Sequence, residues 1–142
     1  SEILSLSAEG GFTRGVDSVH TVDQAGAAAK SIASSLGCTI AVTGENDLVT
    51  DGRTALIVSG GHPLMKSVTG TGCAASVIIA AFLSVEPDPM AASVSALAFF
   101  KLAAERAAEL ADAPGSFWVQ VLDAMYRITP EELAAKARIT PA

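Results

Sequence analysis

The segment Val68–Cys73 is rich in glycine and leads directly into an apolar run, Ala74 to Leu83. Two glycines around one threonine are typical of a tight turn, and the run after them predicts a buried helix. Such a junction leaves backbone N–H groups unpaired at the positive end of the helix dipole, where anions bind. The rest of the chain must therefore surround a helix that is apolar over most of its length.

Thr71 and Cys73 add a hydroxyl and a thiol to the same turn. Because a helix N-terminus favours the ionised form of a thiol, one interpretation is an oxyanion or phosphate cradle with an ionisable group at Cys73. The alternative is a turn whose glycines serve only the backbone and whose cysteine packs as a small hydrophobe. A short glycine motif does not separate these two interpretations.

The composition limits the class of protein. The 142 residues suffice for one domain with a real core, and half of them are hydrophobic. A mean hydropathy of +0.44 predicts that many helices are buried or lie in an interface. No apolar run reaches the roughly 18 residues of a membrane span. The net charge of −6 argues against nucleic acid as a partner, and two cysteines with no secretory signal favour a cytoplasmic location.

The first half of the chain mixes helix and strand patterns. Ser1–Ala8 is expected to form a short helix, and Thr21–Leu36 carries apolar residues at helical spacing. Cys38–Thr43 predicts a short buried strand, and Asp51-Gly52 between two apolar runs predicts a hairpin over residues 47–59. A helix that leads into a strand suggests an α/β unit with a parallel sheet.

The second half is almost entirely helical in pattern. We expect helices at residues 71–85, 89–111 with Asp88 as N-cap, 116–127 with Phe117, Val121, Leu122 and Met125 inward, and a short last one opened by the capping box Thr129–Glu132. In the longest, residues 90–100 should be buried, whereas Lys101 and Glu105 should lie on a solvated face. One strand and one hairpin are too few for a parallel sheet, so the missing strands must come from a partner or from a preceding segment.

Thr43 is a candidate binding residue because it ends the expected strand. Ligands bind at the carboxyl ends of strands in open α/β sheets, so its hydroxyl is placed to meet a phosphate. The alternative is an ordinary turn after a strand. Cys38, in contrast, is expected inside the strand and in the core.

Glu2, Asp17 and Glu45 are candidate magnesium ligands, because magnesium takes one or two carboxylates together with substrate phosphates. No spacing among them is diagnostic, and exposed surface charge is the alternative for Asp17. His20 and His62 match no ligand pattern, although His62 lies in a glycine loop beside a proline. The turn at residues 70–72 lacks the Gly-Lys-Ser/Thr of a Walker loop.

Several segments also recur in one known family in this order. They are Arg14–Ser18, Ala41–Glu45, Val49–Gly52, Gly61–Met65, Val68–Ala74 and Pro114–Phe117, with Asp47, Leu122–Ala124, Tyr126 and Pro130-Glu131 as further matches. Together they resemble the hydroxyethylthiazole kinase family. The combination of G-H-P-L-M with V-T-G-T-G-C-A is specific, and the resemblance covers nearly the whole chain.

The resemblance implies a ribokinase-like, three-layer α/β fold. Residues 1–142 would form a single domain that is the helix-rich C-terminal half of such a kinase, with a short strand set and a hairpin, and a further segment would precede Ser1. The implied reaction is phosphorylation of the primary hydroxyl of 4-methyl-5-(2-hydroxyethyl)thiazole by ATP with Mg²⁺, in thiamine biosynthesis or salvage. The implied assembly is a homotrimer with active sites at subunit boundaries.

Roles for individual residues also follow from the resemblance. Thr43 would contact ATP, Gly70 would contact the substrate, and Gly70, Thr71 and Gly72 would form an anion hole. Cys73 would be catalytic, at a position where many ribokinase-like relatives have an aspartate. Glu2 would end the family's Asn-x-x-Glu element near magnesium, although the asparagine of that element would precede Ser1. Asn46, where the family more often has an aliphatic residue, is a minor departure.

Two other functions stay open beside this one. The chain also fits another ribokinase-like small-molecule kinase or the related nicotinamide-nucleotide-hydrate dehydratase, although Cys73 in place of aspartate argues against both. A non-enzymatic alternative is a binding or assembly fragment that is inactive without its N-terminal half.

Overall fold

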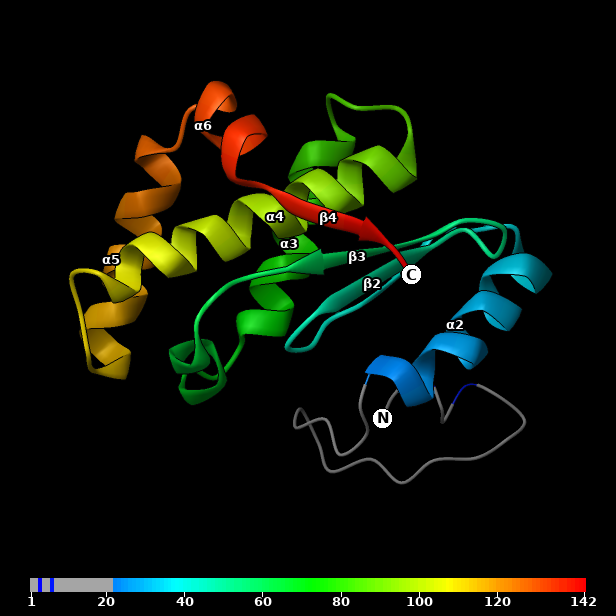
Figure 1. Ribbon diagram of the computed structural model, residues 1–142, viewed down its shortest axis with the longest axis horizontal. Coiled ribbons are helices and arrows are strands. Elements are labelled where there is room, and N and C mark those ends of the chain that lie inside the picture. Colours follow the sequence, from blue (N-terminus) through cyan, green and yellow to red (C-terminus); the bar gives the residue numbers. More distant parts are fainter. Residues whose placement is uncertain (1–2, 4–5, 7–21) are drawn as a thin grey trace. The chain divides into compact units, whose positions relative to one another are not determined.

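The computed structural model describes residues 3, 6 and 22–142, which fall into two compact units (Figure 1). The first ends at Ile57 and also includes Thr140–Ala142, and the second is Val58–Ile139. Of the helix expected over residues 1–8, the structure describes Ile3 and Leu6, both helical. The candidate ligands Glu2 and Asp17, together with His20 and the segment Arg14–Ser18, lie outside the described residues.

The first unit contains the amphipathic helix that the sequence predicts. Helix α2 spans Val22–Leu36 and buries its alanine face against strands β1 and β2; the buried residues are Ala25, Ala28, Ala29 and Ala33. The helix ends at Gly37, whose φ of 61° is left-handed, and the Cys38 N–H donates to the Ala33 carbonyl at 3.2 Å. This is the usual glycine C-cap of a helix, and it brings the chain directly into β1.

The strands are β1 (Ile40–Val42), β2 (Asp47–Thr50), β3 (Ala55–Ser59) and β4 (Arg138–Pro141), hydrogen-bonded in that order. The expected parallel pairing is wrong for β1 and β2, which run antiparallel with Ala41 opposite Val49. The loop of residues 43–46 is short, and a parallel pair needs a connection of about a dozen residues or more. Cys38 was expected in the core, but it precedes β1 and is exposed.

The hairpin predicted from Asp51-Gly52 is confirmed as β2 and β3. Asp51 Oδ1 accepts from the N–H groups of Thr54 at 2.7 Å and Arg53 at 2.8 Å, and these bonds hold the pKa of the Asp51 carboxyl below its ordinary value. Gly52 has a φ of 89°, and a Cβ built on it would lie 2.6 Å from the Ser34 backbone nitrogen. Glycine is therefore required at this turn by conformation and by the close approach of α2.

The second unit is helical: the 3₁₀ helix η1 (Pro63–Ser67), then α3 (Thr71–Leu83), α4 (Pro89–Ala108), α5 (Pro114–Arg127) and α6 (Pro130–Lys136). Two N-caps predicted from sequence are confirmed. Asp88 accepts from the Met90 N–H at 3.1 Å, and Thr129 Oγ1 accepts from the Glu132 N–H at 3.3 Å. None of the helices in the described part of the chain is long and apolar enough to cross a membrane.

Helix α4 is the helix on which α3, α5 and α6 pack (Figure 1). Among the residues at most 1% exposed are Ala103, Ala104 and Ala107 of α4, and Phe117 and Val121 of α5, the helix packed on it. Small residues allow helix axes to approach closely, which suits a helix on which three others pack. The expectation that residues 90–100 are largely buried is confirmed.

Two expectations for individual side chains of this unit are wrong. Lys101 was assigned to a solvated face, but it is only 4% exposed, because its side chain reaches the Gly60–Gly61 loop of the same unit. Leu122 was expected inward on α5, but it is 49% exposed, since the helix turns Phe117, Val121 and Ala124 toward the interior instead.

Helix α3 was expected to be buried, and this is also wrong. Within α3, all of which is described, Ala75 is the one buried residue, and Val77 is 70% exposed. The apolar surface continues past its end, where Val85 is 83% exposed. In general, an exposed apolar strip of this kind marks a surface that can associate.

Two glycines of the first unit, Gly37 and Gly52, offer a matched test of the hairpin. Both have positive φ, but no described atom lies within 4 Å of a Cβ at Gly37, whereas Gly52 faces the Ser34 backbone. We expect Gly37→Ala to lower the free energy of unfolding by about 1 kcal/mol, and Gly52→Ala to lower it by roughly 1–3 kcal/mol more because of the overlap. Urea denaturation of the full-length protein measures both, and equal losses would contradict the packing of α2 on the turn.

The exposed strip on α3 predicts that the 142-residue chain alone self-associates. Val77→Glu should shift gel filtration toward smaller species, because it puts a charge into the strip. Ser76→Glu, one residue away at an exposed polar position, is the control and should change the elution less. A wild-type chain that is a monodisperse monomer with a cooperative thermal transition would rule this out.

Candidate functional site

The Val68–Cys73 segment forms the turn and helix start that the sequence predicts. Gly70 is the N-cap of α3 with a left-handed φ of 92°, and its carbonyl accepts the first helical bond, from the Ala74 N–H at 2.9 Å. Since the helical ladder begins there, the N–H groups of Thr71, Gly72 and Cys73 have no partner within the helix. They point out of the positive end of a 13-residue helix.

The turn is open around its glycines. No described atom lies within 4 Å of a Cβ built at Gly70 or Gly72, and Cys73 is exposed. The Thr71 hydroxyl is used differently: it donates to the Met65 carbonyl at 3.4 Å, which ties η1 to the start of α3. The described geometry thus offers backbone N–H groups and one thiol to a ligand, while the threonine side chain supports the turn.

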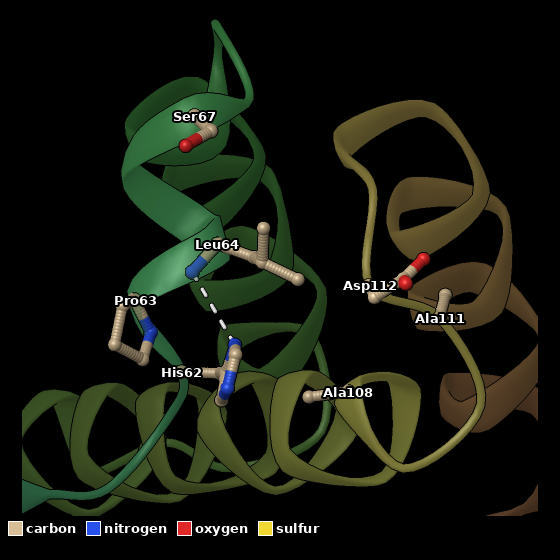
Figure 2. A pocket seen from close by; sticks show the side chains of 7 residues that line it. All are labelled: His62, Pro63, Leu64, Ser67, Ala108, Ala111 and Asp112. Atoms are coloured by element: carbon tan, nitrogen blue, oxygen red, sulfur yellow. Dashed lines mark hydrogen bonds between the residues drawn. The ribbon is translucent and has the colours of Figure 1, made fainter.

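Helix η1 also borders a hollow of about 470 Å³ in the second unit (Figure 2). One side comes from His62, Pro63, Leu64 and Ser67, and the other from Ala108, Ala111 and Asp112 at the end of α4. The His62 Nδ1 accepts from the Leu64 N–H at 3.3 Å and so caps η1, as the dashed line in Figure 2 marks. His62 is therefore a loop-stabilising residue in this structure, and its ring lies 6.1 Å from that of Phe117.

Thr43 belongs to the first unit, where it is exposed directly after β1. The loop that follows is held by Asp47, whose Oδ1 accepts from the Gly44 N–H at 2.8 Å and which is itself 4% exposed. Thr43 thus stands at the carboxyl end of a strand on a fixed turn, as predicted. Thr43 is part of the first unit, whereas the Gly70 turn is part of the second.

The described residues do not provide a metal centre. No group of three or more His, Cys, Asp or Glu side chains among them is arranged to hold an ion. Glu45 is exposed in the loop after β1, and Glu2 lies outside the described residues. The magnesium site that the resemblance implies therefore has no described ligand set.

Comparison with known proteins agrees with the resemblance seen in the sequence. The model of the hydroxyethylthiazole kinase family matches residues 1–131. The chain belongs to the hydroxyethylthiazole kinase family. It is 49% identical to the hydroxyethylthiazole kinase of Desulfotalea psychrophila over 98% of its own length, and 46% identical to that of Moorella thermoacetica over the same share.

A solved structure of a member of the hydroxyethylthiazole kinase family extends the comparison to the fold. The chain is similar to the hydroxyethylthiazole kinase protein of Pyrococcus horikoshii OT3 with a TM-score of 0.79 and 39% identity, over 84% of this chain. The α/β, ribokinase-like fold class is thereby confirmed for a helix-rich chain with a small sheet. The chain spans about half the length of these relatives: 51% and 52% of the two kinases and 47% of the solved structure.

The roles that membership of the hydroxyethylthiazole kinase family suggests for individual residues stay predictions. The structure brings Gly70, Thr71, Gly72 and Cys73 together at one helix start. The sequence did not predict that Lys101 and Glu105 of α4 and Arg138 of β4 contact the Gly60–Gly61 loop. The available signal was a group of three charged residues, Lys101, Glu105 and Arg106, in a mostly apolar helix, together with the glycine pair before His62.

Proposed function

We propose that the full-length protein transfers the γ-phosphoryl group of ATP to the primary hydroxyl of 4-methyl-5-(2-hydroxyethyl)thiazole, in thiamine biosynthesis or salvage. The family match over residues 1–131 supports the choice of reaction. The observation that carries the proposal is the open turn at Gly70, whose N–H groups lie at the start of a long helix.

The chemistry of phosphoryl transfer suits such a turn. The substrate oxygen forms a bond to the γ-phosphorus while the bond to the β,γ-bridging oxygen breaks, and ADP leaves with that electron pair. Catalysis rests mainly on positioning and on stabilising the charge of the transferred group. The N–H groups of Thr71, Gly72 and Cys73 would bind the phosphoryl oxygens, and Gly70 would let the substrate approach without a side chain in the way.

Cys73 would act on the substrate hydroxyl. Its thiol is exposed beside the N–H groups of the turn, so in its ionised form it would accept the hydroxyl proton as the new bond forms. Because the transition state is loose, little proton removal is needed early, and the contribution of Cys73 should lie at the low end for a general base. Thr43 would donate its hydroxyl hydrogen to an ATP phosphate.

Other parts of the proposal rest on the family alone. Magnesium would accompany the ATP phosphates, although the described residues hold no cluster of ligands for it. A homotrimer, and a segment preceding Ser1 that completes the domain, are inferred in the same way. Another ribokinase-like kinase or a hydrate dehydratase is less favoured, because the matched family is that of the thiazole kinases.

Substitutions of Cys73 test the function and the catalytic role together. In the full-length protein, Cys73→Ala should lower kcat for the thiazole alcohol by roughly 10- to 100-fold and leave ATP binding nearly intact. Cys73→Asp should retain or raise activity, since a carboxylate is charged at neutral pH. Cys73→Ser should resemble alanine, because a hydroxyl does not ionise there.

Steady-state kinetics with ATP and the thiazole alcohol measure these effects. Cys38→Ala is the matched control, because Cys38 is also an exposed free cysteine but is not part of the Gly70 turn. A wild-type protein that does not phosphorylate the alcohol would refute the function. An alanine variant as fast as wild type would leave the backbone turn as the whole site and make Cys73 a packing residue.

Substitution of Thr43 tests the nucleotide contact. If its hydroxyl meets an ATP phosphate, Thr43→Val should weaken ATP binding by about 1–3 kcal/mol and affect the thiazole alcohol less. Thr54→Val, at an exposed threonine of the same unit, is the control. Isothermal titration with ATP decides the matter, and unchanged affinity of Thr43→Val would exclude this role.

A further inference from the structure

Three charged side chains hold the Gly60–Gly61 loop, which precedes η1. Glu105 Oε1 accepts from the Gly61 N–H at 2.9 Å, and the Arg138 guanidinium pairs with the same oxygen. Lys101 Nζ donates to the Gly60 carbonyl at 3.5 Å. Lys101 and Glu105 are one turn apart on α4. This helix therefore binds both a backbone donor of the loop, the Gly61 N–H, and a backbone acceptor, the Gly60 carbonyl.

The two glycines lie close to the side chains around the loop. A Cβ on Gly60 would lie 2.5 Å from the Arg138 guanidinium and 2.6 Å from Glu105 Oε1. On Gly61 it would lie 3.1 Å from Met65 Sδ, and both glycines have left-handed φ angles, 116° and 82°. The charged groups thus occupy the space that a side chain on Gly60 would need.

A continuous series of contacts connects these loop interactions with the candidate site. His62 follows Gly61 and caps η1, and the Met65 carbonyl at the middle of η1 accepts from the Thr71 hydroxyl. Val68 follows the last residue of η1, and its N–H donates to the same Met65 carbonyl at 3.3 Å. The position of the Gly61 backbone therefore sets where η1 lies, and η1 in turn sets the approach to the Gly70 turn.

The presence of a charged residue at position 101 also needs an explanation. Lys101 is 4% exposed and lies among buried alanines of α4, where an apolar side chain would pack without the cost of removing a charge from water. A hydrogen-bonded charged cluster fixes geometry, because each group must keep its partners. Such a cluster beside a glycine pair favours a role in orienting the loop over a role in stability alone.

We propose that Glu105 is a positioning residue that holds the Gly60–Gly61 loop, and through η1 the Gly70 turn, in the arrangement needed for phosphoryl transfer. This role rests on the proposed function. Arg138 orients the Glu105 carboxylate, and Lys101 fixes the adjacent carbonyl. Glu105 acts on the reaction through the loop backbone and the helix η1.

The test compares variants of the full-length protein. Glu105→Ala removes the acceptor for the Gly61 N–H and should lower kcat by roughly 10- to 100-fold, with a smaller change in KM for the thiazole alcohol, because the turn acts on the transition state. Glu105→Gln keeps a carbonyl oxygen at that place and should restore most of kcat. Glu109→Ala, one turn further along and exposed, is the matched control and should leave kcat unchanged.

Hydrogen–deuterium exchange reads the loop without relying on activity. Residues 59–68 should exchange faster in Glu105→Ala than in wild type, and Glu109→Ala should match wild type. Arg138→Gln keeps Glu105 and should give an intermediate rate, so the proposal stays testable if Glu105→Ala folds poorly. The expected result is faster exchange and a reduced kcat per folded molecule in Glu105→Ala, and rescue of both in Glu105→Gln.

Other results would separate the two proposals. Wild-type kcat in Glu105→Ala, or a loss of kcat without faster exchange in the loop, would overturn the positioning role. If the wild-type protein does not phosphorylate the alcohol, the proposed function fails. In that case faster exchange in Glu105→Ala, with wild-type exchange in Glu109→Ala, still supports the hold on the loop, and equal exchange in all variants overturns it.

Discussion

The alanine face of α4 is the constraint on which the second unit depends. Ala103, Ala104 and Ala107 have almost no side chain, which allows other helices to approach closely; Phe117 and Val121 of α5, which packs on α4, are buried as well. The opposite charges on α4 then act at its periphery. Arg106 pairs with Glu132 of α6 at 2.6 Å, and Glu105 holds the glycine loop. One helix thereby fixes both the last helix and the approach to the candidate site.

Much of the fold follows from local patterns. The glycine stop of α2, the Asp-Gly hairpin and the caps at Asp88 and Thr129 each depend on a few neighbouring residues, so the sequence predicts them well. Strand β4 was missed, because it pairs with β3 far back in the chain and its four residues carry no strand pattern of their own. The burial of Lys101 escaped for a similar reason: its partner, the Gly60 carbonyl, lies 41 residues away.

The candidate site, too, was predictable only where local conformation determines it. The turn at Gly70 and the helix after it were readable from Gly-Thr-Gly and the apolar run, because both are set by local conformation. The exposure of α3 was not, since burial of an apolar helix depends on what covers it. Nor did the sequence reveal that the Thr71 hydroxyl is used internally, on Met65. Which of these groups meet a substrate stays a prediction.

Gly60 and Gly72 are glycine for opposite reasons. Gly60 is confined by the protein itself, because its φ of 116° is left-handed and a methyl group there would contact the ends of the Arg138 and Glu105 side chains. Gly72 meets no described atom and lies within α3, where alanine is the better helix former. Selection for a stable fold therefore retains glycine at position 60 but hardly acts on position 72. Only selection for binding would retain Gly72. A survey of substitutions scored by abundance alone would tolerate changes at Gly72 and reject changes at Gly60.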